Sequence, residues 1–156
     1  YLHRHGWLHL DLKPANIVAE SGTAKLIDLS IARKPGRGSA GIGTREHMSP
    51  EQAAGGVLSE ASDVWGIASV LFECLAGRLP FEDHMGEKGE KRYPQLEAPA
   101  PSLGRYFDGP PGLIEAIDAG LGAEPVGRPS VAALSRALQG SAGVDPRVPA
   151  NAAPSP

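Results

Sequence analysis

The chain has 156 residues, of which 41% are hydrophobic and 21% are charged, and its formal net charge is −3 at pH 7. These values are near those of globular domains, which excludes a wholly disordered chain. The acidic balance argues against nucleic acid or an anionic membrane as the main partner. The one cysteine excludes an intrachain disulfide and fits a reducing, cytoplasmic location, and no apolar run is long enough to cross a bilayer.

The first part of the chain predicts short extended pieces around loops. Apolar and β-branched residues at 17–18 and 25–27 flank Glu20-Ser21-Gly22, a composition typical of a hairpin turn. Residues 33–43 are dense in glycine and proline and predict a mobile loop.

The strongest helix prediction covers residues 63–76. Ser62 or Asp63 can cap its start, and Gly77 followed by Pro80 can end it. Apolar residues occupy nearly every face of this segment, so we expect a buried helix at the centre of the domain.

The C-terminal part predicts a loop, two shorter helices and an unstructured end. Residues 82–112 are charged and then rich in proline, as loops often are. Helices are expected over 113–121 and 129–138. We expect a folded domain over residues 1–139 and a disordered tail or linker, rich in alanine and proline, over 140–156.

The run His9-Leu10-Asp11-Leu12-Lys13-Pro14-Ala15-Asn16 carries candidate chemistry. The carboxylate of Asp11 can accept a proton from a hydroxyl, and the ammonium of Lys13 can neutralise a phosphate. The amide oxygen of Asn16 can ligate a hard cation such as magnesium. A further carboxylate, Asp28, follows an extended segment downstream.

The run resembles the catalytic loop of protein kinases, H-R-D-x-x-x-x-N, and Asp28-Leu29-Ser30 resembles the D-F-G triplet that follows it. The segment from Gly43 to Glu51 resembles the A-P-E end of a kinase activation segment, and Asp63-Val64-Trp65 resembles the start of the family's buried helix. In identity, order and spacing, these motifs are similar to the C-terminal lobe of a bacterial-type serine/threonine protein kinase. The resemblance implies an α+β, mostly α-helical fold with a short β-hairpin near the catalytic loop.

The resemblance implies a role for each polar residue of these motifs. Asp11 would be the catalytic base, and Lys13 would act on the transferred phosphate. Asn16 and Asp28 would hold Mg²⁺, and together with Lys13 and the apolar Val18 they would bind ATP. The implied activity is phosphoryl transfer from Mg-ATP to serine or threonine hydroxyls of protein substrates.

The resemblance also implies supporting roles. Thr44 would contact the catalytic aspartate and lysine and position the substrate, and Asp63 would brace the backbone of the catalytic loop. His9 would lie buried, and Glu51 would pair with Arg128 because a buried carboxylate needs a cationic partner.

Two departures from the family pattern carry predictions. Leu10 stands where most members have an arginine that pairs with a phosphorylated residue of the activation segment. Leucine cannot form this pair, so we predict that phosphorylation of Ser39 or Thr44 is not the main switch. Ser30 replaces the glycine of D-F-G, which restricts the backbone there but leaves metal binding by Asp28 intact.

Several patterns have a simpler interpretation. Residues 36–41 fit G-x-G-x-x-G, but they lie after the catalytic loop and no V-A-I-K lysine follows, so we interpret them as activation-segment loop. His3 and His5 are expected to be ordinary exposed residues, and Cys74 is expected to be a small hydrophobe on the buried helix.

No segment of the sequence matches the glycine-rich loop, ATP-binding lysine and partner glutamate of the family's N-terminal lobe. Because residue 1 is tyrosine, we interpret the chain as an N-terminally truncated fragment without that lobe and expect it to be nearly inactive alone. A non-catalytic, pseudokinase-like binding module is the alternative, and a poorly folding gene remnant is a third. Retention of the polar residues of the catalytic site favours the enzyme; these are Asp11, Lys13, Asn16 and Asp28. The sequence does not predict the oligomeric state.

Overall fold

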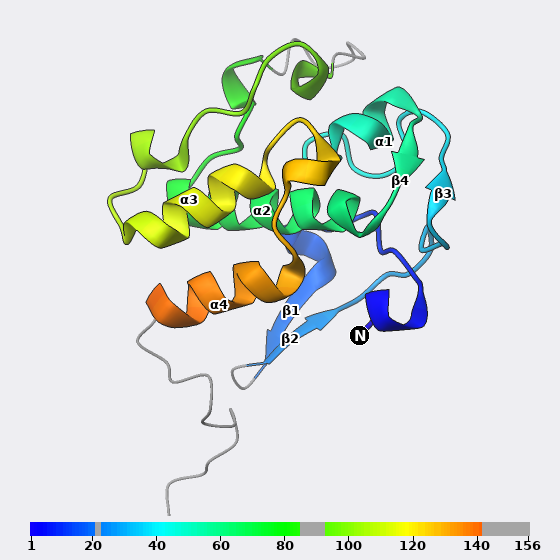
Figure 1. Ribbon diagram of the computed structural model, residues 1–156, viewed down its shortest axis with the longest axis horizontal. Helices are drawn as coiled ribbons and strands as arrows, with labels where there is room; N and C mark the ends of the chain where they lie inside the picture. The colour runs from blue at the N-terminus through cyan, green and yellow to red at the C-terminus, as the bar shows by residue number, and fades with distance from the viewer. Residues whose placement is uncertain (21–22, 85–92, 142–156) are drawn as a thin grey trace, which may run out of the picture.

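The computed structural model describes residues 1–20, 23–84 and 93–141. Its longest helix, α2 (Glu60–Ala76), runs through the middle of the molecule (Figure 1). Ser59 caps it, because the Ser59 side chain accepts from the backbone N–H of Ala61 while the Ser59 backbone N–H donates to Ser62. Gly77, in the left-handed conformation, ends the helix. The predicted end is confirmed, whereas the start lies before the predicted residue 63.

The main hydrophobic core lies between α2 and the helices that follow it. α3 (Pro111–Gly120) packs along α2, and α4 (Val131–Ser141) packs against α3 (Figure 1). Nearly every face of α2 is covered, as predicted. The residues buried in this core are Trp65, Ala68, Phe72, Phe81, Leu103, Leu113, Ile117 and Leu121.

The predicted hairpin is present. β1 (Ile17–Glu20) pairs with antiparallel β2 (Thr23–Leu26), so that Ile17 lies opposite Leu26. The turn residues 21–22 lie outside the described residues. This hairpin lies at one edge of the molecule, beyond the end of the catalytic loop (Figure 1).

A second, shorter ribbon was not predicted. β3 (Gly36–Arg37) pairs with antiparallel β4 (Val57–Leu58), which lies beside helix α1 (Pro50–Ala54) (Figure 1). The segment over residues 33–43 is therefore not wholly irregular, because its centre is hydrogen-bonded to the chain just before α2.

The remaining described elements are single 3₁₀ turns, and three of them lie within the predicted loop over residues 82–112, the last two residues of which belong to α3. Residues 85–92 and 142–156 lie outside the described residues, so the predicted tail is covered only at its start. There α4 continues to Ser141, two residues beyond the predicted boundary at 139, and the tail after it stays a prediction. The turns are η1 (His3–His5), η2 (Pro14–Asn16), η3 (Glu82–His84), η4 (Pro94–Leu96), η5 (Leu103–Arg105) and η6 (Pro125–Gly127).

Two further observations concern the surface. Cys74 is exposed on α2, so the prediction of a small packed hydrophobe is wrong for this position. Among the described residues, no helix combines the length and the apolar character needed to cross a membrane.

Candidate active site

Asp63, in the first turn of α2, holds the backbone of the catalytic loop. Its side chain is 3% exposed, and its two oxygens accept the N–H groups of His9 and Leu10, each at 2.8 Å. Leu10 adopts a left-handed backbone with φ 67°, which is costly for a branched side chain. The two hydrogen bonds to one buried carboxylate keep the loop in this conformation.

His3 contacts the same carboxylate, which corrects the expectation that it is an ordinary exposed residue. Its side chain is 20% exposed, and its Nε2 lies 2.7 Å from an oxygen of Asp63. The hydrogen bond to Asp63 raises the pKa of His3 against the opposing effect of burial. His5, by contrast, is exposed as predicted.

His9 lies buried behind the loop. Its Nδ1 accepts the backbone N–H of Asp11 at 3.3 Å, which leaves Nε2–H to donate to the carbonyl of Ile27, also at 3.3 Å. The carbonyl of Asn16 accepts the N–H of Ile27 at 3.0 Å. These bonds fasten the segment that carries Asp28 to the catalytic loop.

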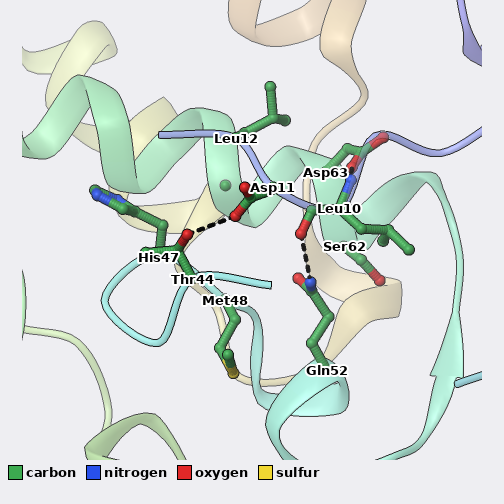
Figure 2. Close-up of a pocket in the computed structure, with 10 residues that line it drawn as sticks. Leu10, Asp11, Leu12, Thr44, His47, Met48, Gln52, Ser62 and Asp63 are labelled. Carbon is green, nitrogen blue, oxygen red and sulfur yellow. Dashed lines mark hydrogen bonds between the residues drawn. The ribbon is translucent and has the colours of Figure 1, made fainter. Parts of the chain in front are cut away.

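Asp11 lies at the centre of the polar cluster. Its Oδ1 accepts the hydroxyl of Thr44 at 2.6 Å (Figure 2), and its Oδ2 lies 2.9 Å from the ammonium of Lys13. Lys13 also donates to the Thr44 hydroxyl at 2.8 Å, which closes a triangle between the three side chains. Asn16 donates its amide N–H groups to the carbonyl and to Oδ2 of Asp11.

The cluster keeps Asp11 ionised. Burial alone would raise the pKa of this carboxyl, but hydrogen bonds from Thr44 and Lys13 and the charge of Lys13 outweigh burial and lower it. At neutral pH the side chain is therefore a carboxylate that can accept a hydrogen bond or a proton from a hydroxyl placed beside it.

Asp28 is exposed, and it lies in a left-handed conformation with φ 62°. Its Oδ1 accepts the backbone N–H of Ser30 at 3.1 Å, and hydrogen bonding from Ser30 lowers the pKa of the carboxyl. The serine that replaces the family's glycine thus helps to keep Asp28 charged.

The donor set fits magnesium held together with a phosphate. The amide nitrogen of Asn16 faces Asp11, so its carbonyl oxygen remains as the metal-ligating atom, and Asp28 offers carboxylate oxygen. No three His, Cys, Asp or Glu side chains gather as a metal site in the part of the chain that is described. An ion here would take its other ligands from phosphate and water. Val18 is exposed on β1, where an apolar ring could contact it.

Glu51 and Arg128 form a buried ion pair, although 76 positions of the sequence separate them. The two N–O distances are 2.8 and 2.9 Å, and the Arg128 side chain is fully buried. Arg128 also donates to the carbonyls of Ala61, Gly122 and Ala123. Burial raises the pKa of Glu51, but Arg128 outweighs this effect and lowers it. The pair joins α1, the start of α2 and the segment around η6.

Gln52 is a supporting residue that sequence reasoning missed. Its amide nitrogen donates to the carbonyl of Leu10 at 2.8 Å (Figure 2) and to that of Ile42 at 2.9 Å. The amide thus joins the catalytic loop to the activation segment. The space enclosed by this junction is too small for a water molecule, so it is a packing contact and not a ligand pocket. No local pattern marks Gln52, because glutamine is usually a surface residue.

The family model described as Protein kinase domain matches residues 1–111. The chain belongs to the protein kinase family. The serine/threonine-protein kinase PknB of Mycolicibacterium smegmatis is 34% identical over 145 residues, which cover 88% of this chain and 23% of the relative. PknD of Mycobacterium tuberculosis strain H37Rv is 36% identical over 132 residues, covering 81% of this chain and 20% of the relative.

These kinases confirm the predicted similarity to bacterial serine/threonine kinases. PrkC of Bacillus subtilis is 32% identical over 123 residues, covering 75% of this chain and 19% of the relative. The chain therefore spans less than a quarter of the length of these three curated relatives.

A solved kinase structure confirms the fold class. The PK-1 kinase of Cydia pomonella granulovirus matches 85% of this chain and 50% of its own chain, with a TM-score of 0.69 and 21% identity. At this identity the likeness concerns the fold alone. The predicted α+β, mostly helical kinase architecture is thus confirmed.

Proposed function

We propose that this chain provides the catalytic lobe of a serine/threonine protein kinase, which transfers the γ-phosphoryl group of ATP to hydroxyls of protein substrates. The observation that carries the proposal is the triangle of Asp11, Lys13 and Thr44, with sides of 2.6 to 2.9 Å. It combines an ionised carboxylate, a cation and a hydroxyl from the activation segment at one point.

Each member of the triangle has a separate task. Asp11 orients the substrate hydroxyl and accepts its proton as the bond to phosphorus forms. Lys13 neutralises charge on the transferred phosphoryl group from its position beside Asp11. Thr44 positions both side chains and fixes the place of the activation segment next to the reacting hydroxyl.

Asn16 and Asp28 would hold magnesium bound to ATP, and Val18 would contact the adenine ring. Magnesium bound in this way supplies positive charge that stabilises the phosphates. The hydrogen bonds from Asn16 to Asp11 would keep the base and the metal ligand at a fixed separation.

Efficient transfer also needs groups on the opposite side of the nucleotide. Protein kinases use a glycine-rich loop and a lysine there, and the one match to the loop pattern in this sequence, residues 36–41, lies after the catalytic loop with no such lysine following it. Because the reaction depends on positioning the phosphates, we propose that this lobe acts when those elements are supplied together with it.

The test uses the full chain fused behind the glycine-rich, lysine-bearing lobe of a bacterial serine/threonine kinase. Transfer of labelled phosphate from ATP to a serine-containing protein is measured for the fusion and for its Asp11→Asn variant. We expect the variant to lose at least about 100-fold in rate, because general base catalysis contributes 10²–10⁴-fold. Asp108→Asn, which changes an exposed aspartate, is the matched control and retains activity.

The competing interpretation is a non-catalytic module that binds proteins. It predicts a folded fusion that transfers no phosphate, or transfer that Asp11→Asn leaves unchanged. Either result would contradict the proposed function.

A further inference from the structure

His47 lies in the turn between Thr44 and Met48, and it faces α2. Only 8% of the residue is exposed. Its Nδ1 is 3.1 Å from the hydroxyl of Ser69, and its Nε2 is 3.5 Å from Oε2 of Glu73. Figure 2 shows His47 beside Thr44, on the side of the cluster that borders α2. The imidazole therefore stands between the activation segment and the central helix.

Glu73 has an unsatisfied oxygen at this contact. Its Oε2 is buried, and it accepts no hydrogen bond within the described residues. A buried acceptor without a donor is costly, and more so when it carries charge. The 3.5 Å separation from His47 exceeds the roughly 2.7–2.9 Å of a charge-assisted N–H···O bond. A closer and stronger contact is available if the imidazole gains a proton.

The turn that carries His47 is linked to the catalytic triangle. The carbonyl of Thr44 accepts the N–H groups of His47 at 3.0 Å and of Met48 at 2.9 Å. The hydroxyl of Thr44 contacts both Asp11 and Lys13. A shift of the imidazole toward α2 would therefore be transmitted to Thr44 through the hydrogen bonds of one tight turn.

We propose that His47 is a proton-sensitive positioning residue, which holds Thr44 against Asp11 when neutral and closes on Glu73 when protonated. In the neutral state Nδ1–H of the imidazole donates to the hydroxyl oxygen of Ser69, so Nε2 carries no proton and Glu73 remains without a donor. In the protonated state Nε2–H donates to Oε2 of Glu73, and the turn moves toward α2. The position of the turn from Thr44 to Met48, and with it the contact of Thr44 with Asp11, then depends on pH.

Burial and the surrounding charges together determine which protonation state of His47 is present. Burial lowers the pKa of His47, whereas the negative charges of Glu73 on α2, Glu46 in the same turn and Asp11 in the catalytic loop raise it. The positive charge of Lys13 lowers it, and burial outweighs the carboxylates. His47 is therefore neutral at pH 7 and becomes charged only on acidification below its ordinary value of 6.5.

The proposal rests on the proposed function only where it identifies Thr44 and Asp11 as part of a catalytic site. Its test is therefore a pH titration by NMR of the full chain without nucleotide, which needs no activity. Labelled histidine side chains report the protonation of His47, and backbone amides report the positions of Thr44 to Met48. We expect these amides to shift with the same midpoint as the His47 ring, below pH 6.5.

Glu73→Gln removes the proposed acceptor charge and keeps the shape of the side chain. We expect the His47 midpoint to move to lower pH and the amide shifts of the turn to shrink. Glu60→Gln is the matched control, because Glu60 is also on α2 but lies 3.7 Å from His3. It should leave the His47 midpoint in place.

Three results would overturn the proposal. The first is a His47 ring that titrates while the amides from Thr44 to Met48 do not follow it. The second is a Glu73→Gln variant with an unchanged His47 midpoint. The third is a ring that stays neutral over the whole pH range in which the chain remains folded. The first and third need only the unsubstituted chain, and all three are independent of whether the fusion transfers phosphate.

Discussion

Leu10 shows how one substitution changes the way in which a kinase activation segment is held. In place of an arginine that binds a phosphate, the buried leucine side chain packs with Leu8 and Leu58, and Ile31 and Ile42 cover them. Gln52 adds hydrogen bonds to the carbonyls of Leu10 and Ile42. Apolar burial and one amide thus fix the segment without added charge.

Phosphorylation of the segment should therefore have little effect. Ser39 is exposed, and the apolar cluster around Leu10 offers no cation to a phosphate at that position. We expect Ser39→Glu to leave the phosphoryl transfer rate of the fusion within about twofold, as for an ordinary surface substitution. A manyfold rise in rate, for the glutamate variant or for Ser39 phosphorylated in the intact protein, would show that the segment is switched by charge.

His3 gives stability that depends on pH. Its pKa is raised in the folded chain, so its contribution is complete below the ordinary value of 6.5 and is lost as pH rises through the folded value. We expect His3→Ala to lower the free energy of unfolding in urea by about 1.5–3 kcal/mol at pH 6, as for a hydrogen bond to a charged group.

The same comparison at pH 9 should give a smaller loss, because the stabilisation from charged His3 is lost as pH rises through its folded pKa. His5→Ala, in the same 3₁₀ turn but exposed, controls for loss of an imidazole from this segment. A His3→Ala loss that is equal at both pH values would show that packing, and not charge, explains the effect.

The elements differ in how well sequence predicts them. The body and end of α2 were predictable because apolar residues cover its faces and Gly77 stops it, which are local signals. Its start was not, because Ser62 is the third residue of a capping box whose cap is Ser59. The ribbon of β3 and β4 has two residues in each strand and no alternating pattern, and only pairing with a distant segment defines it.

The junction of α1, α2 and η6 depends on the pair of Glu51 and Arg128. We expect Arg128→Met to cost about 3–5 kcal/mol in the free energy of unfolding, because it leaves a buried carboxylate without its cation. Adding Glu51→Gln to this variant should restore part of the loss, since no uncompensated charge remains. Unfolding in urea at pH 7 measures both values.

Acidification provides the second arm of this test. The pKa of Glu51 is lowered on folding, so its stabilisation is present above the ordinary value of 4.5 and is lost as pH falls through the folded value. The difference between the unsubstituted chain and Arg128→Met should therefore shrink in acid. A difference that stays constant would show that Arg128 acts through the three carbonyls that it contacts and not through Glu51.

Over the whole molecule, the candidate site draws on segments that only the fold brings together. The residue types of the catalytic loop and Asp28 could be predicted because the kinase resemblance depends on short local motifs. The contacts of His3 with Asp63, of Gln52 with Leu10 and of His47 with Glu73 could not, because each joins distant positions and uses side chains that are ordinary in sequence. Asp63 of α2 holds the catalytic loop by two hydrogen bonds, so the position of the loop depends on how firmly α2 is packed.

Helix α3 approaches α2 closely at Gly120. A methyl group there would lie 2.6 Å from Cβ of Ala68, which is closer than two carbons can approach. In an exposed helix, glycine to alanine adds about 1 kcal/mol of stability. At this site we expect Gly120→Ala to reduce the free energy of unfolding by about 1–3 kcal/mol, because it overpacks the contact between the two helices.

Ala68→Gly on the opposite helix vacates the space that the new methyl needs. The double variant should therefore be more stable than Gly120→Ala alone, although Ala68→Gly by itself destabilises α2. Urea unfolding of the four chains gives the coupling energy between the two positions. Additive effects of the two substitutions would mean that α3 shifts to relieve the clash. Coupling between them would mean that α2 has a fixed position in the core. In that case α2 also gives a fixed position to Asp63 and, through Asp63, to the catalytic loop.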